Sequence, residues 1–201
     1  TRATTEKLHD FAFRLAQKRK SRGHKGMVTC VDKANVFRSM AFFRKIFDER
    51  AGKFPDVETA YSYVDAQPLE LIRRPWDFDV LVMENMFGDI LTDEASMLAG
   101  SLGLLPSASL GTDGPGLYEP IHGSAPDIAG RDVANPTGAI LSTAMLLRHS
   151  LELPDAAAAV EAAVSATYSS GLRTPELAGN SRAPIAGTRA FGAAVVSHLK
   201  L

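Results

Sequence analysis

The sequence predicts an α/β fold with a parallel or mixed sheet, followed by a region of different texture. In the first half of the chain, short apolar strand patterns alternate with segments of helical periodicity. From Gly100 to Pro136, Gly, Pro and Ser become frequent, and mainly helical patterns follow. The 201 residues are enough for one large domain or two small ones. We therefore expect two units, residues 1–99 and residues 100–201, with the change near Gly100.

The strands and helices of the first unit alternate regularly along the chain. A first helix should be capped by Thr4 or Thr5 and end at basic residues, which suit the negative end of a helix dipole. The expected elements after it are a buried strand at 27–31, a helix at 36–51, a strand at 57–64, a helix at 66–73, a strand at 79–82 and a helical segment over 84–94.

The second unit should contain little strand and much helix. Only short strand-like pieces occur in its Gly- and Pro-rich part, at 108–110 and 117–118. Three helical patterns then follow, at 136–147, 155–169 and 188–199, with a polar loop at 177–184 between the last two.

Composition excludes several classes of partner. The formal net charge of −1 provides no electrostatic basis for binding nucleic acid or an anionic membrane. No uninterrupted apolar run approaches the length that spans a bilayer. The single cysteine, Cys30, excludes an intramolecular disulfide and fits a reducing compartment, so we expect a cytoplasmic protein and a core role for Cys30. No signal peptide is visible, and the absence of Met at position 1 indicates a processed chain or a piece of a longer one.

Three aspartates follow predicted strands and could meet at the carboxyl edge of the sheet. Asp65 ends one strand, and Asp89 and Asp93 open the helix after the next, one turn apart on the same face. Mg²⁺ or Mn²⁺ prefers such carboxylate oxygens. In the alternative interpretation, Asp89 and Asp93 are exposed helix charges and Asp65 is a helix cap. Spacing alone favours this alternative.

Lys33 follows the first buried strand, where ligands often bind in α/β sheets. A lysine in a partly desolvated cleft has a lowered proton affinity and can act as an acid or base. The alternatives are a surface lysine in a loop and a salt bridge to Asp32, and the sequence position alone favours these.

A loop rich in Gly and small residues runs from Glu119 to Gly130, and Asn135 follows it. Its backbone N–H groups could approach a phosphate or a ribose closely. Asp127 could accept both ribose hydroxyls and would repel a 2′-phosphate, which favours NAD over NADP. The loop is not the G-x-G-x-x-G of a Rossmann fold. An ordinary Gly/Pro loop with a buried His122 is the equal alternative.

Several motifs occur in an order that resembles one family. They are Val31-Asp32-Lys33-Ala34-Asn35-Val36, Tyr63-Val64-Asp65-Ala66, Glu84-Asn85-Met86-Phe87-Gly88-Asp89-Ile90-Leu91-Thr92-Asp93, Gly103-Leu104-Leu105-Pro106-Ser107-Ala108, Glu119-Pro120-Ile121-His122-Gly123-Ser124-Ala125-Pro126-Asp127-Ile128-Ala129-Gly130 and Ala134-Asn135-Pro136. This order resembles the β-decarboxylating dehydrogenases, which act on isopropylmalate, isocitrate, homoisocitrate or tartrate. The resemblance runs from the first helix to the C-terminus and implies the C-terminal portion of their two-domain, non-Rossmann fold.

The resemblance also implies a role for each candidate residue. Residues 1–99 would belong to the substrate, metal and dimerisation domain, and residues 100–201 to the cofactor domain. Asp65, Asp89 and Asp93 would hold Mg²⁺ or Mn²⁺, while Lys33 and Asp65 would act in catalysis at the partner subunit's site, so that a homodimer shares its active sites. The residues that would bind NAD are Glu119, His122, Gly123, Ser124, Ala125, Pro126, Asp127, Ile128 and Asn135.

The implied substrate is a small hydroxy-dicarboxylate. The motifs are most similar to members that convert 3-isopropylmalate to 2-oxoisocaproate in leucine biosynthesis, with isocitrate, homoisocitrate and tartrate or malate as alternatives. The family subunit is about twice as long, the size of a two-domain enzyme. An N-terminal half with the substrate-binding basic cluster and a tyrosine acid is therefore expected elsewhere. A catalytically incomplete fragment and a regulatory subunit are the remaining alternatives.

Overall fold

The computed structural model describes residues 1–179 and 184–200. The chain divides into two compact units, Thr1–Leu98 and Ala99–Leu201, and the division falls beside Gly100. The predicted polar loop at 177–184 begins inside a short helix, α7, Pro175–Ala178, and the rest of that prediction falls largely on residues outside the described ranges.

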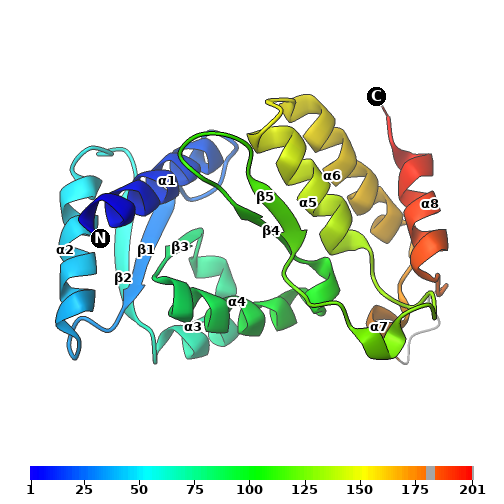
Figure 1. Ribbon diagram of the computed structural model, residues 1–201, viewed down its shortest axis with the longest axis horizontal. Helices are drawn as coiled ribbons and strands as arrows, with labels where there is room; N and C mark the ends of the chain where they lie inside the picture. Colours follow the sequence, from blue (N-terminus) through cyan, green and yellow to red (C-terminus); the bar gives the residue numbers. More distant parts are fainter. Residues whose placement is uncertain (180–183, 201) are drawn as a thin grey trace. The chain divides into compact units, whose positions relative to one another are not determined.

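The first unit contains a parallel three-stranded sheet in the order β2–β1–β3 (Figure 1). Its strands are β1, Met27–Asp32, β2, Glu58–Tyr63, and β3, Val80–Val82. β1 is the central strand and is buried from Val28 to Asp32, because it has a neighbour on each side and helices packed against it. The parallel α/β organisation predicted from the alternating pattern is therefore present.

Four α-helices and a 3-10 turn accompany this sheet. They are α1, Arg2–Lys20, α2, Arg38–Ala51, α3, Gln67–Arg73, the turn Pro75–Asp77, and α4, Asn85–Ala99. The predicted cap of the first helix was wrong, because Thr1 rather than Thr4 or Thr5 accepts the N–H of Thr4 at 3.4 Å. The predicted basic last turn of α1 is confirmed.

The core of the first unit is aromatic and joins α1 and α2 to β1. Phe13 of α1 stacks on Phe47 of α2 and on Phe54, with ring centroids 5.1 Å apart in both pairs. Cys30 of β1 lies fully buried in the same cluster, as predicted, and this burial raises the pKa of its thiol. The stacked rings fix how α2 lies on β1, and α2 carries groups that matter for the candidate site.

The second unit combines a two-stranded antiparallel sheet with a helical layer. β4, Pro106–Ser109, pairs with β5, Leu117–Pro120, which extends the two predicted strand-like pieces. α5, Thr137–His149, packs on α6, Pro154–Ser169, and α6 packs on α8, Thr188–His198 (Figure 1). Phe191 and Val195 of α8 meet Ala163 and Val164 of α6 in the core.

The helices at 137–149, 154–169 and 188–198 agree with the three helical patterns of the sequence to within a few residues. Among the residues at 1–179 and 184–200, no helix combines the length and the apolar character that crossing a membrane requires.

Candidate functional site

The parallel sheet of the first unit brings Lys33 and Asp65 together. Lys33 follows β1 and Asp65 follows the neighbouring strand β2, so both lie at the carboxyl edge of the sheet. The Lys33 Nζ atom is 2.5 Å from Asp65 Oδ1. The hydrogen bond from Lys33 lowers the pKa of the Asp65 carboxyl. Asp65 is exposed and Lys33 is half-buried, so this ion pair is open to a ligand at the sheet edge.

Two of the alternatives considered for these residues do not hold. Lys33 does not pair with Asp32, because the Asp32 carboxylate is fully buried and is occupied by Arg44. Asp65 is not a helix cap, since the N-cap position of α3 is Ala66 and no side chain caps that helix. The pair is therefore a Lys–Asp contact between the ends of two adjacent strands.

Asp89 and Asp93 lie on α4, which begins directly after β3. The Glu84 carboxylate accepts the N–H groups of Met86 at 3.1 Å and Phe87 at 2.9 Å, and so caps the start of the helix. Asp89 and Asp93 are exposed and stand one turn apart, and their carboxylates form no hydrogen bond or ion pair within the described ranges. Their oxygens are free to accept a hard cation, which satisfies the donor chemistry of Mg²⁺ or Mn²⁺.

The described part of one chain does not gather a complete metal site. No three His, Cys, Asp or Glu side chains among residues 1–179 and 184–200 lie close enough together to hold an ion. Asp65 is engaged by Lys33, while Asp89 and Asp93 stand on α4. The grouping of all three as metal ligands stays a prediction.

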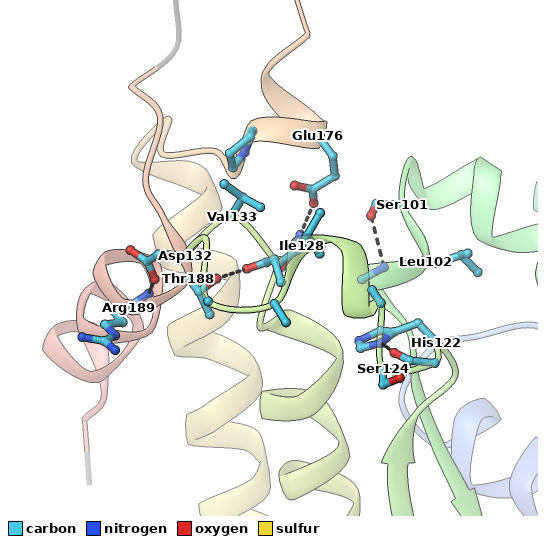
Figure 2. A pocket seen from close by; sticks show the side chains of 18 residues that line it. Ser101, Leu102, His122, Ser124, Ile128, Asp132, Val133, Glu176, Thr188 and Arg189 are labelled. Carbon is cyan, nitrogen blue, oxygen red and sulfur yellow. Dashed lines mark hydrogen bonds between the residues drawn. The ribbon is translucent and has the colours of Figure 1, made fainter.

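The second unit contains a cavity of about 1010 Å³ (Figure 2). The predicted cofactor residues that line it are His122, Gly123, Ser124, Ala125, Ile128 and Asn135. The other three predicted residues, Glu119, Pro126 and Asp127, do not line it. Glu119 belongs to β5, and Pro126 and Asp127 belong to the short 3-10 helix Pro126–Ile128, from which only Ile128 reaches the cavity.

Backbone strain is concentrated in the wall of this cavity. Ala125 and Asp132 both line it and have positive φ angles, +43° and +56°, which residues other than glycine rarely adopt. His122 is exposed and donates from Nδ1 to the carbonyl of Gly123 at 2.9 Å, so the alternative of a buried histidine is wrong. Strained backbone in a loop of small residues is typical of a ligand site.

The side chain of Asn135 links three segments of the cavity wall by hydrogen bonds. Its Nδ2 group donates to Glu176 Oε1 at 2.8 Å and to Tyr168 Oη at 3.2 Å. Its Oδ1 atom accepts the N–H of Thr137 at 2.9 Å at the start of α5. Because both amide hydrogens are used and the residue is buried, the side chain orders the cavity wall and has no free donor for a ligand.

Part of the lining comes from residues that sequence reasoning missed. Asp132 anchors the start of α8: its carbonyl accepts the N–H of Thr188 at 3.1 Å and its Oδ1 accepts that of Arg189 at 3.0 Å (Figure 2). A Cβ at Gly187 would lie only 2.4 Å from Asp132 Oδ2, so glycine is required there. A glycine directly before a predicted helix was the available signal. Ser101, Leu102, Gly103 and Glu176 also line the cavity.

Comparison with known proteins identifies the family of the chain. Residues 1–195 match the family described as isocitrate/isopropylmalate dehydrogenase. The 3-isopropylmalate dehydrogenase of Rhodopirellula baltica is 57% identical over 180 residues, which covers 89% of this chain and 50% of that protein. The one from Geobacillus kaustophilus is 57% identical over 173 residues, covering 86% of this chain and 45% of that protein.

Solved structures show the same fold. The crystal structure of isocitrate dehydrogenase from Methylococcus capsulatus has a TM-score of 0.89 and 41% identity, and the match covers 100% of this chain and 57% of that one. A β-decarboxylating dehydrogenase from Thermococcus kodakarensis in its apo form has a TM-score of 0.83 and 42% identity, with 99% and 55% covered. The chain thus spans about half the length of the curated relatives it matches. Sequence and fold together place it in the isocitrate/isopropylmalate dehydrogenase family.

Proposed function

We propose that this chain supplies the metal-binding and NAD-binding parts of an enzyme that oxidatively decarboxylates a hydroxy-dicarboxylate, with 3-isopropylmalate as the favoured substrate. The observation that carries the proposal is the contact between Lys33 Nζ and Asp65 Oδ1 at the carboxyl edge of the parallel sheet. The relatives named 3-isopropylmalate dehydrogenase, up to 57% identical, support the choice of substrate.

Lys33 is the proposed proton carrier. As the substrate hydroxyl is oxidised to a carbonyl, its proton must leave, and Lys33 Nζ, once it has given up a proton and is a neutral amine, would receive that proton and pass it on. Asp65 orients the lysine through their ion pair. NAD, when bound, would supply the hydride acceptor, and the carboxylate that is lost as CO₂ would be the one on the carbon next to the new carbonyl, which leaves its electron pair in an enolate. A bound Mg²⁺ or Mn²⁺ supplies Lewis-acid polarisation of the substrate oxygens.

The metal ligands are proposed to come from two copies of the chain, Asp89 and Asp93 from one and Asp65 from the other. Met86, Ile90 and Met97 of α4 are 60%, 62% and 67% exposed. Their helical spacing places them on one face together with Asp93. An exposed apolar stripe that includes a carboxylate fits a surface where a second chain docks beside the metal. These features support a homodimer with shared active sites.

NAD is proposed to occupy the cavity of the second unit. The small residues at 123–125 permit close approach of backbone to the adenosine half of the cofactor. Asp127 is kept as a proposed determinant for NAD over NADP, although it lies beside the cavity rather than in its lining. The cavity also contains the carboxylates of Asp132 and Glu176, which disfavour an additional phosphate.

The test is NADH formation by the full-length protein with Mn²⁺ and each of 3-isopropylmalate, isocitrate, homoisocitrate, tartrate and malate. We expect the highest kcat/KM with 3-isopropylmalate, a preference for NAD over NADP and loss of turnover when the metal is chelated. No NADH from any of the five would overturn the proposal. Calorimetry separates the regulatory alternative, because a regulatory chain should show no metal-dependent substrate binding.

A further inference from the structure

The carboxylate of Asp32, next to Lys33 in the sequence, is fully buried and bound on two sides. Its partner is Arg44 of α2, which donates from Nε to Oδ2 at 2.7 Å and from Nη2 to Oδ1 at 2.8 Å. Oδ1 also accepts the N–H of Ala34 at 2.8 Å. One carboxylate therefore fixes the residues directly before and after Lys33. The two hydrogen bonds from Arg44 hold that carboxylate next to α2.

Arg44 is also connected to the strand that leads to Asp65. Its guanidinium carbon lies 5.2 Å from the ring centroids of both Tyr61 and Tyr63 of β2. Lys33 Nζ lies 5.7 Å from the same Tyr63 ring. One arginine thus contacts the end of β1 and the end of β2, the two strand ends that present Lys33 and Asp65.

We infer that Arg44 and Asp32 act as positioning residues that hold Lys33 Nζ against Asp65 in the geometry the reaction needs. The pair acts through the turn at Lys33 and through Tyr63. A planar, two-pronged donor is suited to this task because it fixes orientation as well as distance. The inference rests on the proposed function only in assigning Lys33 to catalysis, since the geometric link holds independently.

The same helix offers a matched control. Arg50 of α2 donates to Asp10 of α1 through Nε at 2.6 Å and Nη2 at 2.5 Å. This second pair has the same residue types and the same two-pronged geometry, and its arginine is likewise only slightly exposed. It joins two helices, however, and contacts neither Lys33 nor Asp65. Any loss that comes only from weakened packing of α2 should appear at both pairs.

The experiment compares two matched sets of variants in the full-length protein. The first set is Arg44→Lys and the double variant Asp32→Asn/Arg44→Met, which leaves no buried charge unpaired. The second is Arg50→Lys and Asp10→Asn/Arg50→Met. For each variant, kcat and both KM values are measured with Mn²⁺, thermal unfolding gives the Tm, and a crystal structure gives the distance from Lys33 Nζ to Asp65 Oδ1.

We expect the double variant at Arg44 to lower kcat by about 10- to 100-fold with little change in the KM for NAD, because a small displacement of a catalytic group is costly. Arg44→Lys should recover part of the rate. The Arg50 variants should lower Tm similarly but keep kcat within about twofold of the wild type. Equal losses of kcat in both sets, or an unchanged Lys33–Asp65 distance in the Arg44 double variant, would overturn the inference.

If the double variant does not fold, Arg44→Lys against Arg50→Lys provides the same comparison. If the wild-type protein forms no NADH, the proposed function fails, and the crystallographic distance still decides whether Arg44 positions Lys33. The two failures are therefore distinguishable.

Discussion

The two units hold their candidate functional groups in different ways. The first presents charged side chains at the edge of a parallel sheet, where Lys33 and Asp65 form an ion pair. The second surrounds a cavity with backbone and small residues, and its walls are secured by hydrogen bonds that Asn135 donates to Glu176 and that Asp132 accepts from Arg189. The residues proposed to react thus lie in one unit, and the cavity proposed to enclose a ligand lies in the other.

This difference determines what each unit can do by itself. The cavity is lined entirely by residues of the second unit. The first unit contains the carboxylates that we propose as metal ligands but does not bring three of them together within the described ranges. Changes in the first unit should therefore alter the rate of reaction, and changes in the second should alter the affinity for the cofactor.

The largest expected effect comes from removing the amine of Lys33. In Lys33→Met, we expect kcat to fall by about 10²- to 10⁴-fold, the usual contribution of a positioned acid or base. The dissociation constant of NAD, measured by calorimetry, should stay unchanged, because the cavity belongs to the other unit. Lys25→Met is the control, since Lys25 also faces an aspartate, Asp77, but lies away from the sheet's carboxyl edge. A similar loss of rate in both variants would contradict the assignment.

The second effect should appear in cofactor affinity alone. In Gly187→Ala, the new Cβ would meet Asp132 Oδ2 at 2.4 Å and must push the start of α8 away from the cavity. Overpacking of this kind costs about 1–3 kcal/mol, and the same energy lost from NAD binding would weaken it about 5- to 150-fold. The kcat at saturating NAD should change little.

Gly192→Ala is the matched control for Gly187→Ala. It lies in the same helix and its Cβ would meet no atom within 4 Å. Equal NAD affinity in the two variants would show that the contact between Asp132 and α8 does not shape the site.

The contrast between the units also explains what could be predicted from sequence. The residues of the first unit were found because charged side chains after apolar strands produce a distinct local pattern, and parallel strands must bring their ends to one edge. Which carboxylate pairs with Lys33 was harder to predict. Asp32 is adjacent to Lys33 in the sequence, yet Arg44 of α2 binds Asp32, and Lys33 pairs with Asp65. Long-range pairing of that kind leaves no local signal.

The second unit was predictable only in part for a related reason. The loop before Asn135 was visible through its glycines, whereas Glu176 and Arg189 reach the cavity from helices far along the chain. Asp127 had the right chemistry, but it belongs to a turn from which Ile128 instead reaches the cavity. The orientation of residues in such turns depends on backbone angles that composition does not specify.

A third prediction separates support of the cavity from direct contact with the cofactor. In Asn135→Ala, the N–H of the buried Thr137 loses its acceptor, whereas the exposed Glu176 carboxylate keeps the Thr174 hydroxyl as a donor. Leaving buried polar groups unpaired costs about 1–3 kcal/mol. Stability measured by thermal unfolding should therefore fall together with NAD affinity. Ser124→Ala, at an exposed position in the lining, should change affinity without lowering stability. A stable Asn135→Ala variant with weak NAD binding would instead indicate direct contact.

The smallest effect concerns pH and should be confined to the first unit. His9 is fully buried on α1, donates from Nε2 to the carbonyl of Phe43 at 3.2 Å, and has no partner for Nδ1. Burial lowers the pKa of His9 below its ordinary value of 6.5. The unfolded chain therefore binds a proton at a higher pH than the folded one, so stability is full above pH 6.5 and declines as the pH falls below it.

Hydrogen exchange corrected for intrinsic rates should consequently show α1 and α2 losing protection on acidification through pH 6.5, with α5 and α6 affected less. His9→Gln keeps a neutral N–H donor and removes the titration, so α1 and α2 should lose less protection over the same change. The carboxylates whose pKa values are lowered, such as Asp65 and Asp79, lose their stabilising charge only at lower pH and do not enter this comparison. An equal loss in the variant and the wild type would assign the pH response to other groups and would leave the buried, neutral His9 without influence on the first unit.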